Sequence, residues 1–138
     1  MADRASRRSA SVASMIWAWL FVALLAALAI FQIAVAAGAP LGRFTWGGAH
    51  PGVLPAGLRV AAVVSILIYA VMAALALDRA GAVELVPDDV AAAGMWVVVG
   101  FCVFSVVPNA ISRSAGERYV MTPVSVALAV LALLVALG

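Results

Sequence analysis

Four long apolar runs, separated by shorter polar or glycine- and proline-rich segments, dominate the hydrophobic pattern of this chain. A helix rises 1.5 Å per residue, so about 20 apolar residues cross the ~30 Å hydrocarbon core of a bilayer. With their flanking residues, the runs predict membrane spans at about 15–37, 58–78, 89–108 and 118–137. The expected fold class is therefore all-α, a four-helix transmembrane bundle.

Composition strengthens this reading, since 67% of the residues are hydrophobic and 10% are charged. Charged residues make up about 25% of soluble proteins. We expect one membrane domain over residues 15–138, preceded by a basic, flexible tail at 1–14 that contains Arg4, Arg7 and Arg8. A cleaved signal peptide is the alternative for the first run, but signal h-regions span only about 7–15 residues.

The sequence offers little material for metal, redox or nucleic-acid chemistry. A net charge of +2 is too small to indicate nucleic-acid binding. The single cysteine, Cys102, excludes an intrachain disulfide and a cysteine metal cluster. His50 has no second ligand candidate nearby, and the acidic connector at 78–89 lacks Ca²⁺-loop spacing. We predict no metal site, no cofactor and no catalytic residue.

The segment between the first two runs, residues 38–59, is rich in glycine and proline, which exclude regular helix through most of it. Because it also holds several apolar residues, we expect a cap at the membrane interface. Phe44 and Trp46 would dip toward acyl chains, and Arg43 and Arg59 would reach lipid phosphates or helix C-termini. A partly re-entrant loop is the alternative. For His50 we expect a surface or hydrogen-bonding role, with proton handling as the alternative.

A few polar side chains interrupt the predicted spans. Gln32 needs hydrogen-bond partners in lipid, and a neighbouring helix would supply them. Ser65 and Tyr69 share a helical face, and their hydroxyls are expected to bond a neighbouring helix or the preceding turn. In these roles the residues are packing contacts; a substrate contact is the functional alternative for Gln32.

A weakly polar stripe runs along the third span and its end, where Cys102, Ser105 and Asn109 fall on one helical face. We expect this stripe to face Gln32 in the bundle interior. No general base accompanies Cys102 or Ser105, so neither is assigned as a nucleophile.

Helix starts are indicated at two places. Pro87-Asp88-Asp89 predicts the start of the third helix, with aspartate as N-cap. Ser114-x-x-Glu117 has the form of a capping box, and Thr122-Pro123 is a competing start, so that both an interfacial turn and a membrane helix can follow.

Between the last two spans, Glu117 is expected to pair with Arg113 or Arg118. The distribution of arginine leaves the orientation open, because four arginines fall on each side of the bilayer. The three arginines before the first span favour a cytoplasmic N-terminus and C-terminus. Dual insertion remains an alternative. The arginine- and alanine-rich composition is typical of a bacterial protein, so we expect the bacterial inner membrane.

Two segments resemble those of uncharacterised small four-span bacterial membrane proteins. The first is Gly38-Ala39-Pro40-Leu41-Gly42 with Trp46-Gly47-Gly48 and Leu54-Pro55-x-x-Leu58-Arg59; the second is Asn109-Ala110-Ile111-Ser112-Arg113-Ser114 with Glu117-Arg118 and Thr122-Pro123. The resemblance implies four helices and no established activity. Small multidrug exporters carry a glutamate in their first helix, where this chain has Gln32, and the glycine-rich first-helix signature of fluoride channels is absent from the sequence.

The leading functional interpretation is a non-enzymatic membrane component that packs with lipid, with a protein partner or with a second copy. One alternative is a small dimeric transporter or channel for a neutral or apolar solute. Another is a membrane enzyme or binding protein that acts on lipid through His50, Arg43 and Arg59. The candidate substrate or partner contacts are Gln32, Arg43, Trp46, His50, Arg59, Tyr69, Ser105, Asn109, Arg113, Glu117 and Arg118.

Overall fold

A computed structural model describes residues 11–138, and within them the chain is helical and contains no strand. The long helices are α1 (Val12–Ala36), α2 (Ala56–Arg79), α3 (Asp88–Ala110) and α4 (Thr122–Leu137). Short 3₁₀ segments η2 (Gly42–Phe44) and η3 (Trp46–Gly48) follow α1, and a π-helical turn η4 (Glu117–Met121) runs directly into α4. Four helices are long and apolar enough to span a membrane, the last of them as Glu117–Leu137. The all-α fold class is confirmed, and the protein is a multi-pass integral membrane protein.

The first helix begins earlier than the sequence pattern predicts. The Ser11 side chain accepts a hydrogen bond from the Ser14 amide at 3.0 Å and caps the helix at Val12. Residues 12–14 are therefore helical and do not belong to a flexible tail. Residues 1–10 of the predicted tail, with its three arginines, lie outside the described residues.

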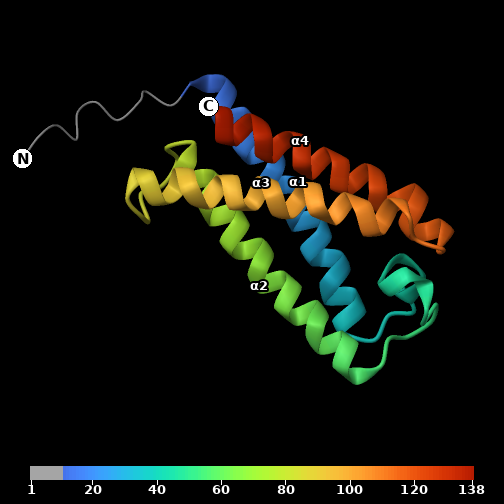
Figure 1. The fold of residues 1–138 in the computed structure, drawn as a ribbon. Helices are drawn as coiled ribbons and strands as arrows, with labels where there is room; N and C mark the ends of the chain where they lie inside the picture. Colours follow the sequence, from blue (N-terminus) through green and yellow to red (C-terminus); the bar gives the residue numbers. More distant parts are fainter. Residues whose placement is uncertain (1–10) are drawn as a thin grey trace, which may run out of the picture.

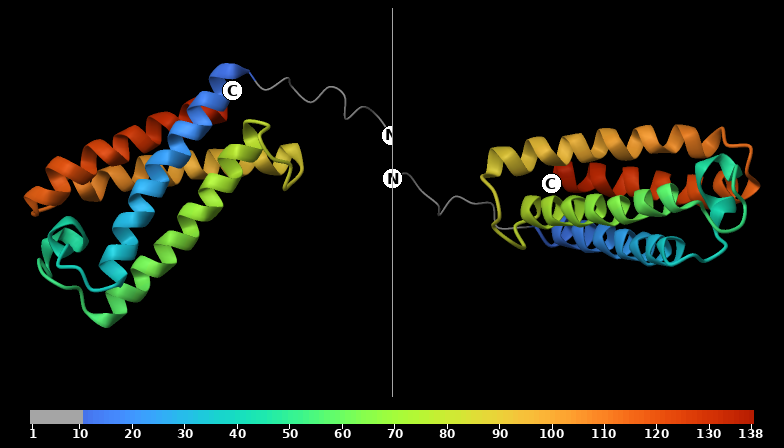
Figure 2. Two further views of the ribbon diagram at one scale, coloured as in Figure 1. Left: turned by 180° about the vertical axis from the view of Figure 1, so that it is seen from behind. Right: turned by 90° about the horizontal axis from the view of Figure 1, so that it is seen from below.

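The four helices form two antiparallel pairs, α1 with α2 and α3 with α4, that meet in a V (Figure 1). The pairs pack closely near the α2–α3 connector, and α2 diverges from α3 toward the opposite end. The view from behind shows the same V, and the view from below shows the helices edge-on, with α3 on one side of the bundle and α1 on the other (Figure 2). The buried core fills the closed end and includes Phe21, Leu25, Met72, Met95 and Leu128.

The connector end of the bundle is fixed by two side chains of α2. The Asp78 carboxylate accepts hydrogen bonds from the amides of Leu85 (2.5 Å) and Val86 (3.0 Å). Arg79 donates to the Ala136 carbonyl at 3.1 Å, near the C-terminus of α4, where a cation complements the helix dipole. These bonds attach the C-terminal end of α2 to the connector and to the C-terminal end of α4.

The predicted N-cap of α3 is wrong by one position. Pro87 is the N-cap and makes no side-chain hydrogen bond, whereas Asp88 and Asp89 lie in the first turn. Proline fits there because its fixed φ suits a helix start, and the carboxylates still lie at the positive end of the helix dipole.

Candidate functional site: a capped pocket between the helix pairs

The cap, residues 38–55, closes the wide end of the V and is folded on itself by backbone contacts. The Gly42 amide donates to the Gly52 carbonyl at 2.9 Å, and the Arg43 amide donates to the Pro51 carbonyl at 3.2 Å. An ideal Cβ on Gly42 would lie 1.6 Å from the carbonyl oxygen of His50. Glycine is therefore required at this position so that the two segments of the cap, around residues 42 and 51, can approach each other.

The cap docks on the turn between α3 and α4. The Ser114 hydroxyl donates to the Arg43 carbonyl, and a Cβ on Gly116 would lie 2.8 Å from the Phe44 ring. Phe44 also packs edge-to-face on Phe31 of α1, with ring centroids 6.3 Å apart. The expectation that Phe44 faces the acyl chains is wrong, because its ring packs against α1 and the α3–α4 turn. The predicted capping box is not formed either, because the Ser114 hydroxyl is turned to the cap.

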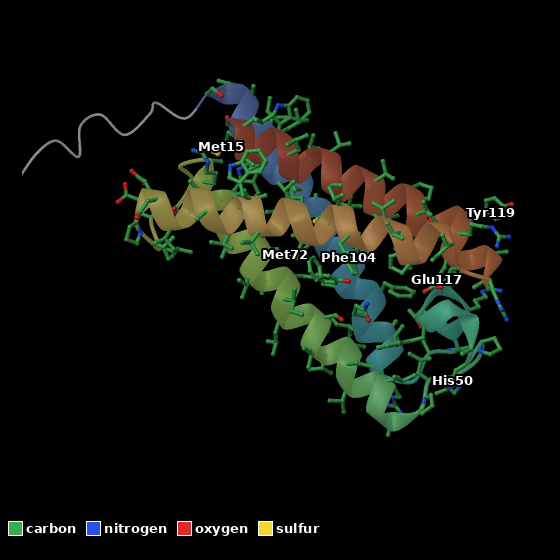
Figure 3. All side chains as sticks on the ribbon, in the orientation of Figure 1. Met15, His50, Met72, Phe104, Glu117 and Tyr119 are labelled. Carbon is green, nitrogen blue, oxygen red and sulfur yellow. The ribbon has the colours of Figure 1, made fainter. Side chains whose placement is uncertain are left out.

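The two arginines and the histidine of the cap region have different surroundings. The Arg59 Nε donates to the Ala36 carbonyl at 2.9 Å, at the C-terminus of α1. Of the two roles expected for Arg59, contact with lipid phosphate or with a helix C-terminus, the second is therefore observed. The Arg43 guanidinium lies 4.8 Å from the centroid of the Phe44 ring. His50 is exposed at the outer edge of the cap (Figure 3). Each of these three side chains therefore has a different environment.

A pocket of about 270 Å³ lies between the two helix pairs beneath the cap. Its wall is mostly apolar, and its polar lining comes from all four helices and the cap: Gln32, Thr45, Ser65, Tyr69, Ser105, Asn109, Glu117 and Ser125. Ile68 of α2 and Phe101 of α3 also line it and are 40% and 50% exposed, so the pocket opens sideways between these helices. Met72, Cys102 and Leu128 belong to both the pocket wall and the core, which closes the pocket toward the connector end.

One polar contact within each helix pair faces this pocket. The Gln32 amide donates to the Tyr69 hydroxyl at 3.5 Å and joins α1 to α2. The Asn109 amide donates to the Ser125 hydroxyl at 2.6 Å and joins α3 to α4. Such bonds satisfy amides that would otherwise be costly in an apolar surrounding. The expected bond between Gln32 and a neighbouring helix is present.

Ser65 and Ser105, two of the three serines that line the pocket, donate within their own helices. The Ser65 hydroxyl donates to the Ala61 carbonyl at 3.0 Å, and the Ser105 hydroxyl donates to the Cys102 carbonyl at 2.7 Å. Their oxygens keep lone pairs that can accept a further hydrogen bond. Together with Gln32, Tyr69 and Asn109, they bring five polar side chains of three spans to one cavity.

Glu117 is buried at the cap end of the pocket, with 7% of its surface exposed. One carboxylate oxygen accepts a hydrogen bond from the Ser112 hydroxyl at 2.5 Å. The predicted ion pair is replaced by contacts to Ser112, because the Arg118 guanidinium donates to the Ser112 carbonyl at 2.8 Å. Arg118 also stacks on exposed Tyr119, and Arg113 is exposed.

Glu117 is the first residue of the π-turn η4, which precedes Pro123. Pro123 has no amide hydrogen, and its ring crowds the carbonyl one turn earlier. The chain widens before it, so that the Thr122 amide reaches the Glu117 carbonyl, five residues back. Thr122 has helical backbone angles and is not the N-cap that the sequence suggests. Figure 3 shows Glu117 toward the cap and Tyr119 at the outer tip, pointing away.

The sequence analysis did not single out several residues of the pocket, among them Phe31, Thr45, Ser125 and Met121. Serine and methionine in an apolar helix usually serve as packing, and only the neighbouring helix shows that Ser125 bonds Asn109. Conversely, five predicted site residues do not line the pocket: Arg43, His50, Arg59, Arg113 and Arg118. Trp46 does line it, and its backbone has a φ of 52°.

Comparison with protein-family models, curated proteins and solved structures returned no match. The resemblance to uncharacterised four-span bacterial proteins stays a prediction.

Proposed function

We propose that the protein binds a small amphiphilic molecule that enters the pocket sideways from the bilayer. The observation that carries this proposal is the convergence of polar side chains from all four helices on one apolar-walled cavity. Sites for small molecules are typically mostly apolar with a few polar groups that fix orientation. The alternative function, a transporter or channel for a neutral or apolar solute, would involve the same residues.

The dimensions of the pocket favour a single-chain molecule. Ligand sites commonly have volumes of about 300–1,000 Å³, and this cavity lies near the lower limit. A small polar group and the first part of one chain fit inside, while the rest of the chain can leave between Ile68 and Phe101. Because the core closes the other end, binding is the step that this conformation supports, and transport would need a further rearrangement.

The remaining interpretations gain no such support. Self-association or docking of a protein partner stays a prediction, since exposed apolar faces are also what contact with lipid requires. A lipid-directed enzyme based on His50, Arg43 and Arg59 has no common site, because Arg59 is engaged at α1 and His50 is exposed. Insertion in a bacterial inner membrane with both termini in the cytoplasm also stays a proposal.

A photolabelling experiment tests the binding proposal. The protein is placed in phosphatidylcholine nanodiscs with a monoacylglycerol that carries a diazirine in its chain, and adducts are located by peptide mass spectrometry. Ser105→Leu fills the pocket without removing a bond between helices, since Ser105 bonds only its own helix among the described groups. Val103→Leu is the matched control on the lipid face, where Val103 is 54% exposed.

We expect adducts on α2 and α3 near the pocket in the wild type and in Val103→Leu, and their loss in Ser105→Leu. Equal labelling of the three proteins would show that the probe reports only general lipid contact, and the proposal would fail.

A further inference from the structure

We infer that the molecule bound in the pocket carries a cationic ammonium group with N–H donors, which distinguishes it from a choline head group, and that Glu117 and the aromatic rings at the cap end receive this group. This inference rests on the proposed function and assigns the chemical class of the ligand. Three observations support it: the charge of the lining, the free hydrogen-bonding capacity of the carboxylate, and the position of the aromatic rings.

Among the described residues that line the pocket, Glu117 is the only aspartate, glutamate, lysine, arginine or histidine. The arginines nearest to it in sequence are engaged elsewhere: Arg118 bonds the Ser112 carbonyl and stacks on Tyr119, and Arg113 is exposed. Arg43 of the cap lies over Phe44. Tyr69 and Cys102 contribute a hydroxyl and a thiol to the lining. Within residues 11–138, the pocket therefore presents a carboxylate without an arginine, lysine or histidine among its lining residues.

The Glu117 carboxylate keeps capacity for a ligand. Ser112 donates to one oxygen, and no donor to the other is present within residues 11–138. A buried carboxylate is costly unless it is paired and hydrogen-bonded. An ammonium group supplies both a charge and N–H donors, and charge-assisted bonds are about twice as strong as neutral ones.

Aromatic rings border the same end of the pocket. Phe31, Phe44 and Trp46 line it together with Glu117, and the Phe31 and Phe44 rings are held edge-to-face. Cations bind favourably over aromatic faces, and aromatic surroundings recur in sites for ammonium ligands. An anionic head group would meet the carboxylate and the negative ring faces, so the pocket selects against it.

Three probes with one diazirine-bearing alkyl chain test this inference: the primary amine, the alcohol and the carboxylate. Labelling is measured in phosphatidylcholine nanodiscs on the wild type and on Glu117→Gln, which keeps an oxygen acceptor for Ser112. Asp89→Asn is the control, because it removes an exposed carboxylate from the first turn of α3, outside the pocket.

We expect the amine to label pocket peptides roughly tenfold more efficiently than the alcohol, and the carboxylate least. Glu117→Gln should bring the amine down to the level of the alcohol, and Asp89→Asn should leave the preference intact. An amine preference that survives Glu117→Gln, or that Asp89→Asn also removes, would overturn the inference.

Met121→Lys provides a second test that leaves the Glu117–Ser112 contact in place. Met121 lines the pocket in the same π-turn, and a lysine there would supply an internal cation. The amine preference should disappear in this variant as well, and its persistence would count against the inference.

Two further outcomes separate the inference from the proposed function. Equal labelling by amine and alcohol that Ser105→Leu abolishes would refute the inference and leave the binding function standing. Labelling by every probe that Ser105→Leu does not reduce would refute both. Replacing part of the lipid with phosphatidylethanolamine identifies the source of the ammonium group: competition with the amine probe assigns it to a lipid head group, and no competition assigns it to a free amine.

Discussion

Substitution of Gly42 offers a direct measure of how the cap is held closed. A Cβ at this position would lie 1.6 Å from the His50 carbonyl oxygen and 2.7 Å from that of Gly52. Both contacts are with backbone, which cannot move aside as a flexible side chain can. Gly42→Ala must therefore separate the two segments of the cap.

Separation of these segments breaks the Gly42–Gly52 and Arg43–Pro51 backbone hydrogen bonds, of 2.9 and 3.2 Å. Each such bond contributes about 0.5–1.5 kcal/mol net, so the closed cap loses about 1–3 kcal/mol. Amide exchange through local opening should then accelerate by about 5- to 150-fold, because 1.4 kcal/mol corresponds to a factor of ten.

Hydrogen exchange followed by mass spectrometry in nanodiscs measures this acceleration on peptides that cover residues 41–54. Gly52→Ala is the matched control, since a Cβ at Gly52 meets nothing within 4 Å and its φ lies outside the left-handed region. The four transmembrane helices should exchange as in the wild type. If the two variants exchanged alike within the cap, the steric argument for Gly42 would be refuted.

Three other substitutions test the framework around the pocket. Asp78→Ala leaves the Leu85 and Val86 amides without their acceptor, and we expect the free energy of unfolding to fall by about 1–3 kcal/mol. The unfolding midpoint should be lower than that of Asp89→Ala, and equal midpoints would contradict this. Gly100→Ala has open space for its Cβ in α3 and should stabilise the protein by about 0.5–1 kcal/mol, which titration with a denaturing detergent measures; no gain would show that helix propensity is not limiting there. Arg59→Gln removes a donor from the last turn of α1, so amides of that turn should exchange faster, and unchanged exchange would mean that water replaces the guanidinium.

Several features of this protein follow from local sequence alone. Lipid forces each span to satisfy its own backbone hydrogen bonds, so long apolar runs predict helices and their number. The weakly polar stripe of α3 is equally local, because helical periodicity places Ser105 and Asn109 on one face. The role of Arg59 at a helix C-terminus also followed from its position beside a span.

The positions of Phe44 and Ser114 show where local reasoning fails. Each was assigned a plausible local role, the one as an interfacial aromatic and the other as the first residue of a capping box. In the fold, Phe44 packs on Phe31 and the Ser114 hydroxyl bonds the Arg43 carbonyl, 71 positions earlier in the chain. A contact over that separation depends on how the cap docks, which no local pattern specifies.

The sequence by itself determined four membrane helices, a glycine-constrained cap and a set of polar side chains that needed partners, because each follows from hydrophobicity, backbone geometry or helical period. Only the tertiary structure decided that the helix pairs diverge and that the polar residues of all four helices share one pocket. It also placed Glu117 in the pocket lining, in a π-turn that precedes Pro123. Hydrophobic burial is non-directional, so apolar runs fix that helices form and leave their angles and facing residues to the contacts between them.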